Sequence, residues 1–498
     1  MTRSELRAFK HSEAAFFFKN PKHTITMNND EDLYRDTESF RDSVSTISED
    51  GKRVFIRPKK PKGKFYTART KVSIALLILL FGIPFLKFNG EPFMLFNILE
   101  RKFIVFGIIF WPQDFILFVL ASITAIVGVI LFTVIYGRIW CGWLCPQTVF
   151  LEMVFRKIEY KIEGDYRQQK KLANMPWNAE KMRKKGIKWI LFYAISFLIA
   201  NCFLSYIIGV DELYKIASEP PAEHIGGLFT ILIFTTVFFF VFNWFREQAC
   251  IVVCPYGRLQ GVLLDKKSIQ VSYDYKRGEN RGKFRKNDDR AALNLGDCID
   301  CNLCVAVCPT GIDIRNGSQM ECVNCTACMD ACDSVMEKVK LPKGLIRYAS
   351  EEMISEGTKF TFSKRILAYS AVLIALIITL TSFLVIRSEI ESTVLRVPGT
   401  LYKRDGDTIM NMYNYKILNK SHEHKDLHIE LISPEGEIKV IGFESTISLK
   451  NQEFSEGTLL IYINKDQLDG RKTKLNIGIY QDENLLEEVK TKFNGPIN

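Results

Sequence analysis

The chain contains 498 residues, of which 47 % are apolar and 24 % are charged, and it carries a net charge of +10. A chain of this length predicts about three domains, and its apolar content, which includes 37 phenylalanines, excludes a protein that is soluble throughout. The excess positive charge lies beside apolar segments, where it favours a membrane orientation rather than nucleic-acid binding.

The N-terminal region, residues 1–71, is polar and ends in a basic stretch from Arg57 to Lys71. Its one apolar cluster, Ala14–Phe18, is too short for the core of a signal peptide, so we expect this terminus to stay in the cytoplasm. We expect the first part of it, about 50 residues, to be a flexible tail because polar segments of this kind bury little apolar surface.

Five apolar segments are long enough, or nearly so, to cross a bilayer as a helix of roughly 20 residues. They run from Val72 to Phe88, Phe115 to Tyr136, Ile187 to Ile208, Gly226 to Phe245 and Ile366 to Ile386. Another apolar run, Phe103–Trp111, is too short to span the membrane and predicts a re-entrant or interfacial segment.

Charged residues predict how these segments cross the membrane. Residues 138–185 hold eleven Lys or Arg and five acids, whereas Asp211–Glu223 holds four acids and one Lys. Loops rich in Lys and Arg stay in the cytoplasm. We therefore expect residues 138–186 and 246–364 on the cytoplasmic side of a bacterial inner membrane and the C-terminal region in the periplasm.

Beyond Arg387 the sequence changes to short runs of alternating apolar and polar residues, separated by turn signals. The clearest runs are Leu427–Ile432, Glu437–Ile441, Leu459–Ile463 and Leu475–Tyr480. About 100 residues with this pattern predict a small β-sandwich of immunoglobulin type.

The predicted protein is therefore a multi-domain integral membrane protein. Its parts are a cytoplasmic tail (1–71), a transmembrane region of four helices (72–250), a cytoplasmic α+β ferredoxin domain with linkers (251–364), a fifth transmembrane helix (365–387) and a periplasmic Ig-like domain (388–498).

The cysteines indicate the chemistry. All thirteen lie between Cys141 and Cys332, which a disulfide framework would not explain. Eight of them form two copies of the spacing C-x2-C-x2-C-x3-C, the two-cluster bacterial ferredoxin pattern: Cys298, Cys301, Cys304 and Cys308, then Cys322, Cys325, Cys328 and Cys332.

In this pattern the fourth cysteine of each run ligates the other cluster. We therefore assign one [4Fe–4S] cluster to Cys298, Cys301, Cys304 and Cys332, and the other to Cys322, Cys325, Cys328 and Cys308, although the spacing alone leaves the crossover open. A pair of structural zinc sites is the alternative, but C-x2-C-x2-C crowds three thiolates more tightly than zinc ligation normally needs.

A second group of cysteines lies in two C-x3-C-P motifs, one after the second apolar segment and one after the fourth. Cys141 and Cys145 belong to the first motif, and Cys250 and Cys254 belong to the second. Cysteines four residues apart share one helical face, so we expect each pair on a helix that the proline interrupts shortly afterwards. If two hairpins pack together, the four sulfurs converge on one site. Soft ligands favour Cu(I) there, although zinc, an iron–sulfur cluster or plain packing of small residues also fits.

The exterior domain contains the one histidine cluster in the sequence, His422, His424 and His428. An alternating strand would place all three on one face, which makes capture of external copper a hypothesis. Surface histidines near a turn are common, however, and most are not ligands.

Nine short stretches carry a family resemblance: Phe110–Asp114, Gly137–Thr148, Arg246–Cys250, Cys254–Tyr256, Tyr273–Asp274, Arg277–Glu279, Gly296–Cys298, Pro309–Arg315 and Gly344–Tyr348. Together they cover residues 70–350 in order and closely resemble the cytochrome c oxidase accessory protein family, known as FixG or CcoG, which is linked to assembly of cbb3-type oxidases. The exterior β domain also matches the layout of that family, whereas residues 1–50 carry no part of the resemblance.

The resemblance implies a membrane-bound oxidoreductase that reduces Cu(II) to Cu(I) for copper-delivery and cbb3-type oxidase assembly proteins. It implies two [4Fe–4S] clusters on the eight ferredoxin cysteines, and copper, as substrate or bound ion, at the four cysteines of the C-x3-C-P motifs. We expect an unidentified cytoplasmic donor to reduce one cluster, and the electron to pass to the neighbouring cluster and then to copper. Membrane lipid is an expected partner, and nucleic acid is not. A homodimer is possible, but the sequence does not decide the oligomeric state.

Three other functions compete with this one. The protein is alternatively a quinol-linked electron-transfer subunit, although the sequence offers no clear quinone pocket. It is alternatively a thiol–disulfide exchange protein that uses the C-x3-C-P pairs. The non-enzymatic alternative is a copper chaperone or assembly scaffold whose clusters only sense the redox state.

Overall fold

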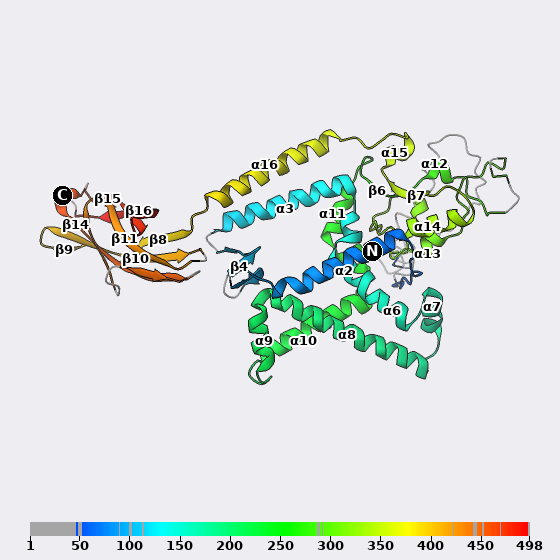
Figure 1. The fold of residues 1–498 in the computed structure, drawn as a ribbon, viewed down its shortest axis with the longest axis horizontal. Coiled ribbons are helices and arrows are strands. Elements are labelled where there is room, and N and C mark those ends of the chain that lie inside the picture. The colour runs from blue at the N-terminus through cyan, green and yellow to red at the C-terminus, as the bar shows by residue number, and fades with distance from the viewer. Residues whose placement is uncertain are drawn as a thin grey trace, which may run out of the picture.

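The computed structural model describes residues 46–47, 52–88, 90–98, 102–111, 114–285, 289–290, 292–421, 423–441, 446–450, 453–468 and 470–496. Most of the predicted N-terminal tail therefore lies outside the described residues. Figure 1 shows an elongated molecule, with the C-terminal sheets at one end, long helices in the middle and the cysteine-rich region at the other end.

Five helices in the described part of the chain are long and apolar enough to span a membrane, which confirms the predicted number. They are α2 (Lys64–Gly82), α3 (Phe115–Tyr136), α8 (Ala179–Ile208), α10 (Ile225–Phe240) and α16 (Lys364–Ile386). A 3-10 turn continues α2 to Phe85, and a π-helical turn continues α10 to Phe245. The helices α3 and α16 lie side by side, and both expose apolar side chains around most of their circumference, as lipid-facing helices do.

Two of these helices differ from the predicted spans in their bounds. The helix α2 begins at Lys64 rather than Val72, and Pro84 lies in the 3-10 turn that ends it. The helix α8 begins at Ala179, where the side chain of Asn178 caps it by accepting a hydrogen bond from the backbone of Lys181. Hydropathy detects only the lipid-facing part of a helix, so it misses polar turns that project beyond the bilayer.

The run Phe103–Trp111, predicted as a re-entrant or interfacial segment, does not form a re-entrant helix, and its interfacial location stays a prediction. This run forms β4 (Lys102–Val105) and β5 (Ile108–Phe110), which pair in antiparallel fashion with β3 (Met94–Asn97). Its apolar residues alternate in burial, and Ile104 and Ile109 form a small core with Leu95. Residues of this pattern make strands, whereas a re-entrant helix needs a continuous apolar face. A short hairpin, β1 (Lys87–Phe88) and β2 (Glu91–Pro92), precedes them.

The segment between α3 and α8 folds back against the ends of the spanning helices that lie opposite to β4 (Figure 1). It comprises α4 (Ile139–Trp143), α5 (Pro146–Thr148), a π-helical turn (Val149–Phe155), α6 (Arg156–Ile162) and α7 (Tyr166–Asn174). Phe155 anchors it, because its ring lies 4.5 Å from that of Phe242 and 4.7 Å from that of Phe192. After α9 (Val210–Ser218) and α10, a π-helical turn (Ala249–Val253) and α11 (Pro255–Leu263) occupy the equivalent place.

The cysteine-rich region is built around a two-stranded antiparallel sheet of β6 (Gln270–Tyr273) and β7 (Ile346–Ala349). Between these strands lie α12 (Tyr275–Gly278), α13 (Leu303–Ala306), a 3-10 turn (Ile314–Asn316) and α14 (Ala327–Lys338), and α15 (Glu351–Ser355) follows. The third cysteine of each run lies in a helix, Cys304 in α13 and Cys328 in α14, so the internal repeat in sequence is also a repeat in structure.

The C-terminal region is the predicted all-β domain, with two packed sheets. One contains β12 (Gly436–Val440), β14 (Phe454–Asn464), β10 (Thr408–Asn419), β8 (Ile390–Arg396) and β9 (Lys403–Asp405), and the other contains β13 (Ile447–Leu449), β11 (Lys425–Ser433), β15 (Lys472–Gln481) and β16 (Asn484–Asn494). Every second residue along the strands faces inward, and these residues form one core, centred on Tyr413, Leu459 and Ile477.

Candidate functional site

Two small cavities divide the eight ferredoxin cysteines between them. The first, of about 20 Å³, is lined by Cys298, Cys301, Cys304 and Cys332, which we call the first cysteine group. The second, also of about 20 Å³, is lined by Cys308, Cys322, Cys325 and Cys328, the second cysteine group, together with Cys304. The fourth cysteine of each run therefore lies with the other run, which supports the crossed ligand assignment.

The backbone around both groups has the same unusual conformation. Asp300 and Asn302 have left-handed φ angles of 51° and 54°, and the equivalent residues Asn324 and Thr326 have 52° and 65°. A left-handed β-branched residue such as Thr326 is strained. Turns of this kind expose successive backbone N–H groups toward an enclosed anion, as in many iron–sulfur sites.

The thiols of these groups fit [4Fe–4S] ligation. Burial raises the pKa of Cys322 to about 12 and that of Cys332 to about 12. Iron stabilises such thiolates directly, as bound metal ions do. In the described chain no three cysteine sulfurs lie within 4.8 Å of one another, whereas sulfurs around a mononuclear tetrahedral zinc are about 3.8 Å apart. This spacing disfavours the zinc alternative.

The first C-x3-C-P motif lies directly against the second cysteine group. A Cβ atom on Gly142 would stand 2.4 Å from the carbonyl oxygen of Val323 and 2.8 Å from that of Asn324, so only glycine allows this approach. Cys141 packs against the cluster of buried residues that contains Val323 and Cys325. The first motif and the second cysteine group are thus in van der Waals contact through their own backbones.

Two arginines hold this contact in place. The Arg69 Nε of α2 donates a 2.6 Å hydrogen bond to the carbonyl of Gly142. The Arg138 guanidinium donates to the carbonyl of Met320, two residues before Cys322, and to that of Gly257 in α11. The motif is therefore fixed to a spanning helix, to the second C-x3-C-P hairpin and to the second cysteine group at once.

The expectation that each C-x3-C pair lies on one helical face is wrong. Cys141 lies in α4, but Cys145 is extended, with φ −61° and ψ 125°, and Cys254 is likewise extended after the π-helical turn of Cys250. The proline does not interrupt a helix but occupies the first position of the next one, in α5 and α11. The residue before a proline avoids the helical region, which explains both extended cysteines.

The four cysteines of the two motifs, which we call the membrane-edge cysteines, are nonetheless neighbours. Burial, together with the charges of Cys145, Cys141 and Cys254, raises the pKa of Cys250 to about 12. Burial also raises the pKa of Cys141 to about 11, and its Sγ lies 3.3 Å from the Oε1 of Gln260, to which it donates. In the described chain no three of their sulfurs lie within 4.8 Å of one another, which disfavours a mononuclear four-thiolate ion.

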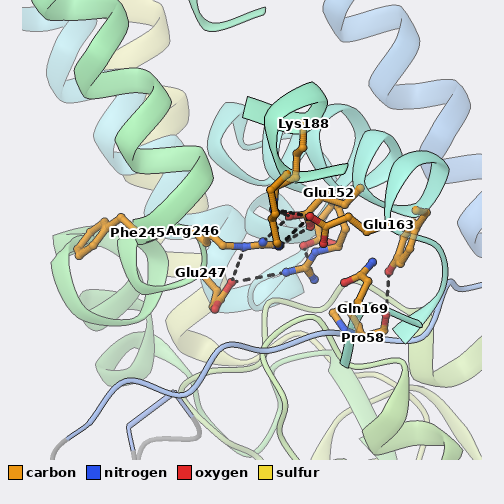
Figure 2. Close-up of polar contacts among 12 residues, drawn as sticks. Pro58, Glu152, Glu163, Gln169, Lys188, Phe245, Arg246 and Glu247 are labelled. Atoms are coloured by element: carbon orange, nitrogen blue, oxygen red, sulfur yellow. Dashed lines mark hydrogen bonds and ion pairs between the residues drawn. The ribbon is translucent and has the colours of Figure 1, made fainter. Parts of the chain in front are cut away.

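A buried ion network anchors the second motif (Figure 2). Arg246 donates to both carboxylate oxygens of Glu159, at 2.8 and 2.9 Å, and Lys188 lies 3.4 Å from Glu159 and 2.9 Å from Glu163. Burial alone would raise the pKa of Glu159, but the cations of Arg246 and Lys188 outweigh it and hold the pKa at about 2. Glu247 extends the network to Arg156, at 3.5 Å.

The N-terminal segment 52–66 ties the cysteine-rich region to the membrane edge. Arg53 lies 3.7 Å from Glu247, and the carbonyl of Pro58 accepts a 3.1 Å hydrogen bond from Tyr160. One residue later, the backbone of Lys59 donates a 2.7 Å hydrogen bond to Ala306 in α13. No sequence pattern indicates these contacts, because they join residues far apart in the chain.

An apolar cavity of about 510 Å³ lies between the spanning helices beside the first motif. Leu144 and Pro146, which flank Cys145, form one wall, and side chains of α2, α8 and β3 form the others. The Tyr206 hydroxyl, at its lining, donates a 2.8 Å hydrogen bond to the carbonyl of Leu80. The sequence did not indicate this cavity.

At the opposite end, Asp114 joins the β domain to the helices. Its carboxylate lies 2.7 Å from Arg387, at the end of α16, and 2.7 Å from Lys420, in the turn after β10. Burial would raise the pKa of Asp114, but these cations lower it.

The histidine cluster is only partly described. His422 lies outside the described residues, His424 is exposed and within hydrogen-bonding distance of Ser448, and the His428 ring stacks on Tyr480. In the described part of the chain, the one group of three metal-competent side chains within 4.8 Å is Glu219, Glu223 and His224, which the sequence analysis did not single out.

Three family models match the chain. A 4Fe-4S dicluster domain matches residues 245–351, a 4Fe-4S binding domain matches residues 118–163, and the Ig-like fold at the C-terminus of FixG matches residues 380–496. The first range contains both cysteine groups, and the second contains Cys141 and Cys145.

Curated relatives match over most of their length. The chain is 35 % identical to protein RdxA of Cereibacter sphaeroides over 385 residues, which are 74 % of this chain and 80 % of the relative. It is 32 % identical to the nitrogen fixation protein FixG of Rhizobium meliloti over 422 residues, which are 76 % of this chain and 79 % of the relative. A crystal structure of a FixG-related protein from Vibrio parahaemolyticus matches with 19 % identity and a TM-score of 0.19, covering 22 % of this chain and 97 % of that chain.

Proposed function

The chain belongs to the FixG family of membrane-associated 4Fe–4S electron-transfer proteins, and we propose that it reduces Cu(II) to Cu(I) for assembly of a cbb3-type cytochrome c oxidase. The observation that carries the proposal is the contact of Gly142 with Val323 and Asn324. It brings the membrane-edge cysteines, the proposed copper site, against the second cysteine group. Electrons that reach that group therefore have a short path to a soft thiolate site.

The residues of the chain account for each part of this activity. Bound [4Fe–4S] clusters supply one-electron transfer, and Cu(II) to Cu(I) requires one electron and no proton. The first and second cysteine groups hold those clusters next to each other, because Cys304 lines both cavities. The membrane-edge cysteines favour Cu(I) over Cu(II), since thiolates are soft ligands.

We further propose that the cysteine-rich region is cytoplasmic and the β domain periplasmic, in a bacterial inner membrane. These parts lie at opposite ends of the spanning helices (Figure 1), and the positively charged loops lie at the cysteine-rich end. The released Cu(I) would pass to copper-delivery proteins that serve oxidase assembly.

The test is anaerobic stopped-flow on the purified, chemically reduced protein mixed with Cu(II). Cluster absorbance and Cu(I) trapped by a chromophoric chelator are followed together. We expect one Cu(I) for each electron that leaves the clusters, and slower formation of Cu(I) in Cys141→Ser and Cys250→Ser. Cys202→Ser is the matched control, because Cys202 lies in α8 and belongs to neither motif. Clusters that stay reduced while copper binds would instead indicate a carrier or sensor.

One observation favours a second candidate, quinol-linked electron transfer. The apolar cavity beside Cys145 lies among spanning helices, where a lipid-soluble quinol can enter. A quinol that becomes a quinone releases two protons and gives one electron to each of two clusters. Val149→Trp would fill the cavity. If quinol bleaches the oxidised clusters of the unmodified protein but not those of this variant, the result supports quinol-linked electron transfer. If quinol does not bleach the clusters of the unmodified protein, this candidate function is excluded.

A further inference from the structure

The two cysteine groups differ in their access to solvent. Cys301 of the first group is exposed, whereas no cysteine of the second group is. The second group also faces the membrane-edge cysteines, through Val323 and Cys325. The first group is therefore the one that a soluble electron carrier can approach, and its surroundings decide which carrier can dock there.

Two segments that border the first group carry exposed cations. The loop after α12 is one: its Gly282 N–H donates a hydrogen bond to the carbonyl of Cys298 at 3.2 Å, and Arg290 donates to the same carbonyl at 3.1 Å. From this loop Lys283 and Arg285 project into solvent. Across residues 276–290 the sequence holds seven Lys or Arg and three acids.

The end of α14 is the other segment. Met336 and Leu345 line the first cavity, and between them Lys338 and Lys340 are exposed. We call Lys283, Arg285, Lys338 and Lys340 the basic rim. None of the four forms an ion pair with a carboxylate in the described part of the chain, unlike Lys343 and Arg281, which pair with Glu337 and Glu279.

The acids nearest to the exposed cysteine are partly neutralised. Arg315 lies 2.5 Å from Asp300 and 2.6 Å from Asp313, so these three groups together leave one negative charge beside Cys301 and Cys304. The four unpaired cations of the basic rim outnumber that charge and make the field around the exposed edge positive.

The basic rim does not serve the lipid surface. The cysteine-rich region lies at one end of the molecule, and the loop after α12 is at the side of that region away from the spanning helices (Figure 1). Other cations border the helices: Lys364 is exposed at the start of α16, whereas Lys188 and Arg246 are buried in ion pairs.

We infer that the basic rim is the docking surface for an acidic one-electron carrier protein, which donates electrons to the first cysteine group. Complementary charge would steer the carrier to the exposed Cys301 edge. In the step itself one electron leaves the reduced carrier and enters the cluster at the first cysteine group; no bond forms and no proton moves. The inference rests on the proposed function for the direction of electron flow, but not on copper as the acceptor.

The experiment measures reduction of the oxidised full-length protein without copper, in stopped-flow, with a reduced acidic plant-type [2Fe–2S] ferredoxin as the probe. Two variants reverse the rim, Lys283→Glu/Arg285→Glu and Lys338→Glu/Lys340→Glu. The matched control, Lys170→Glu/Lys171→Glu, makes the same charge change at exposed residues of α7. Iron content and the visible spectrum establish that every variant carries its clusters.

We expect each rim variant to lower the second-order rate constant about 10-fold at low ionic strength, where electrostatic steering reaches about 30 Å. The difference should vanish near 1 M salt, and the oxidised ferredoxin should bind both rim variants more weakly than the control. Equal rates in rim variants and control, or rates that do not depend on salt, would overturn the inference. The inference would also be overturned if the cationic methyl viologen radical reduced the protein faster than a sulfonated viologen radical of net negative charge. Because no copper is present, these outcomes are independent of whether the protein reduces Cu(II).

Discussion

The backbone N–H of Tyr66 donates a 2.7 Å hydrogen bond to the carboxylate of Asp330, 264 residues further along the chain. The N–H of Phe65 donates to the same carboxylate at 3.1 Å. Asp330 lies between the cysteines 328 and 332, so a residue from α14 of the cysteine-rich region caps the first spanning helix. Negative charge at a helix N-terminus is favourable, and here it also attaches one domain to another.

Asp330→Ala should loosen this attachment. Loss of a helix cap typically costs about 1 to 2 kcal/mol, and here the cost falls on the contact between domains rather than on either fold. We expect faster limited proteolysis in the linkers that flank the cysteine-rich region, with unchanged iron content. Asp330→Asn retains one acceptor oxygen and should be intermediate. Identical cleavage rates in all three proteins would refute the role of this cap.

Gly142→Ala should slow electron transfer to copper. The added methyl group would meet the Val323 carbonyl at 2.4 Å, so the first C-x3-C-P motif must move away from the second cysteine group. We expect slower formation of Cu(I) while cluster reduction by dithionite is unchanged. The control is Gly186→Ala, because nothing lies within 4 Å of a Cβ atom at Gly186. A Gly142→Ala protein with normal Cu(I) kinetics would show that the contact is not on the path.

Cys141→Ser combined with Cys250→Ser should abolish copper binding and leave about eight iron atoms per chain, the content of two [4Fe–4S] clusters. The reason is that neither residue belongs to the two cysteine groups. Iron, sulfide and copper analyses of the same sample test this. A fall from about twelve iron atoms to about eight would instead assign a third cluster to the membrane-edge cysteines.

Glu159→Gln should destabilise the membrane edge by several kcal/mol, because it leaves Arg246 and Lys188 buried without a full counter-charge. The pH dependence follows from the same pair. The pKa of Glu159 in the folded protein is about 2, below its ordinary value, so its stabilisation is complete above that ordinary value, about 4.5, and is lost as the pH falls toward 2. Thermal unfolding in detergent between pH 3 and pH 7 should show this slope, and Glu159→Gln should flatten it.

The sequence predicted the parts that depend on local pattern. Twenty apolar residues make a spanning helix, and alternation along residues 427–432 makes a strand, whatever surrounds them. The cysteine spacing likewise predicted which sulfurs would lie together, because each C-x2-C-x2-C run folds as one loop. The crossover of Cys332 and Cys308 remains a ligand assignment to be tested by spectroscopy of single variants.

The sequence could not predict the parts that depend on distant residues. The i, i+4 spacing of Cys141 and Cys145 suggested one helical face, but the proline that follows favours an extended Cys145 and starts a new helix. The fit of Gly142 against Val323 also needs the fold, since a glycine in a motif does not reveal its neighbour. The basic rim combines a loop and a helix end that are separated by both cysteine runs.

The helix α3 is fixed at both of its ends. Beside its first residue, Asp114 is clamped by Arg387 and Lys420, and near its last turn the carbonyls of Val134 and Ile135 accept hydrogen bonds from Ser268 and Ile269. A helix of 22 residues spans about 33 Å. Polar contacts at its two ends therefore connect the β domain, over that distance, to the segment that leads to β6, whose Val271 lines the cavity of the second cysteine group.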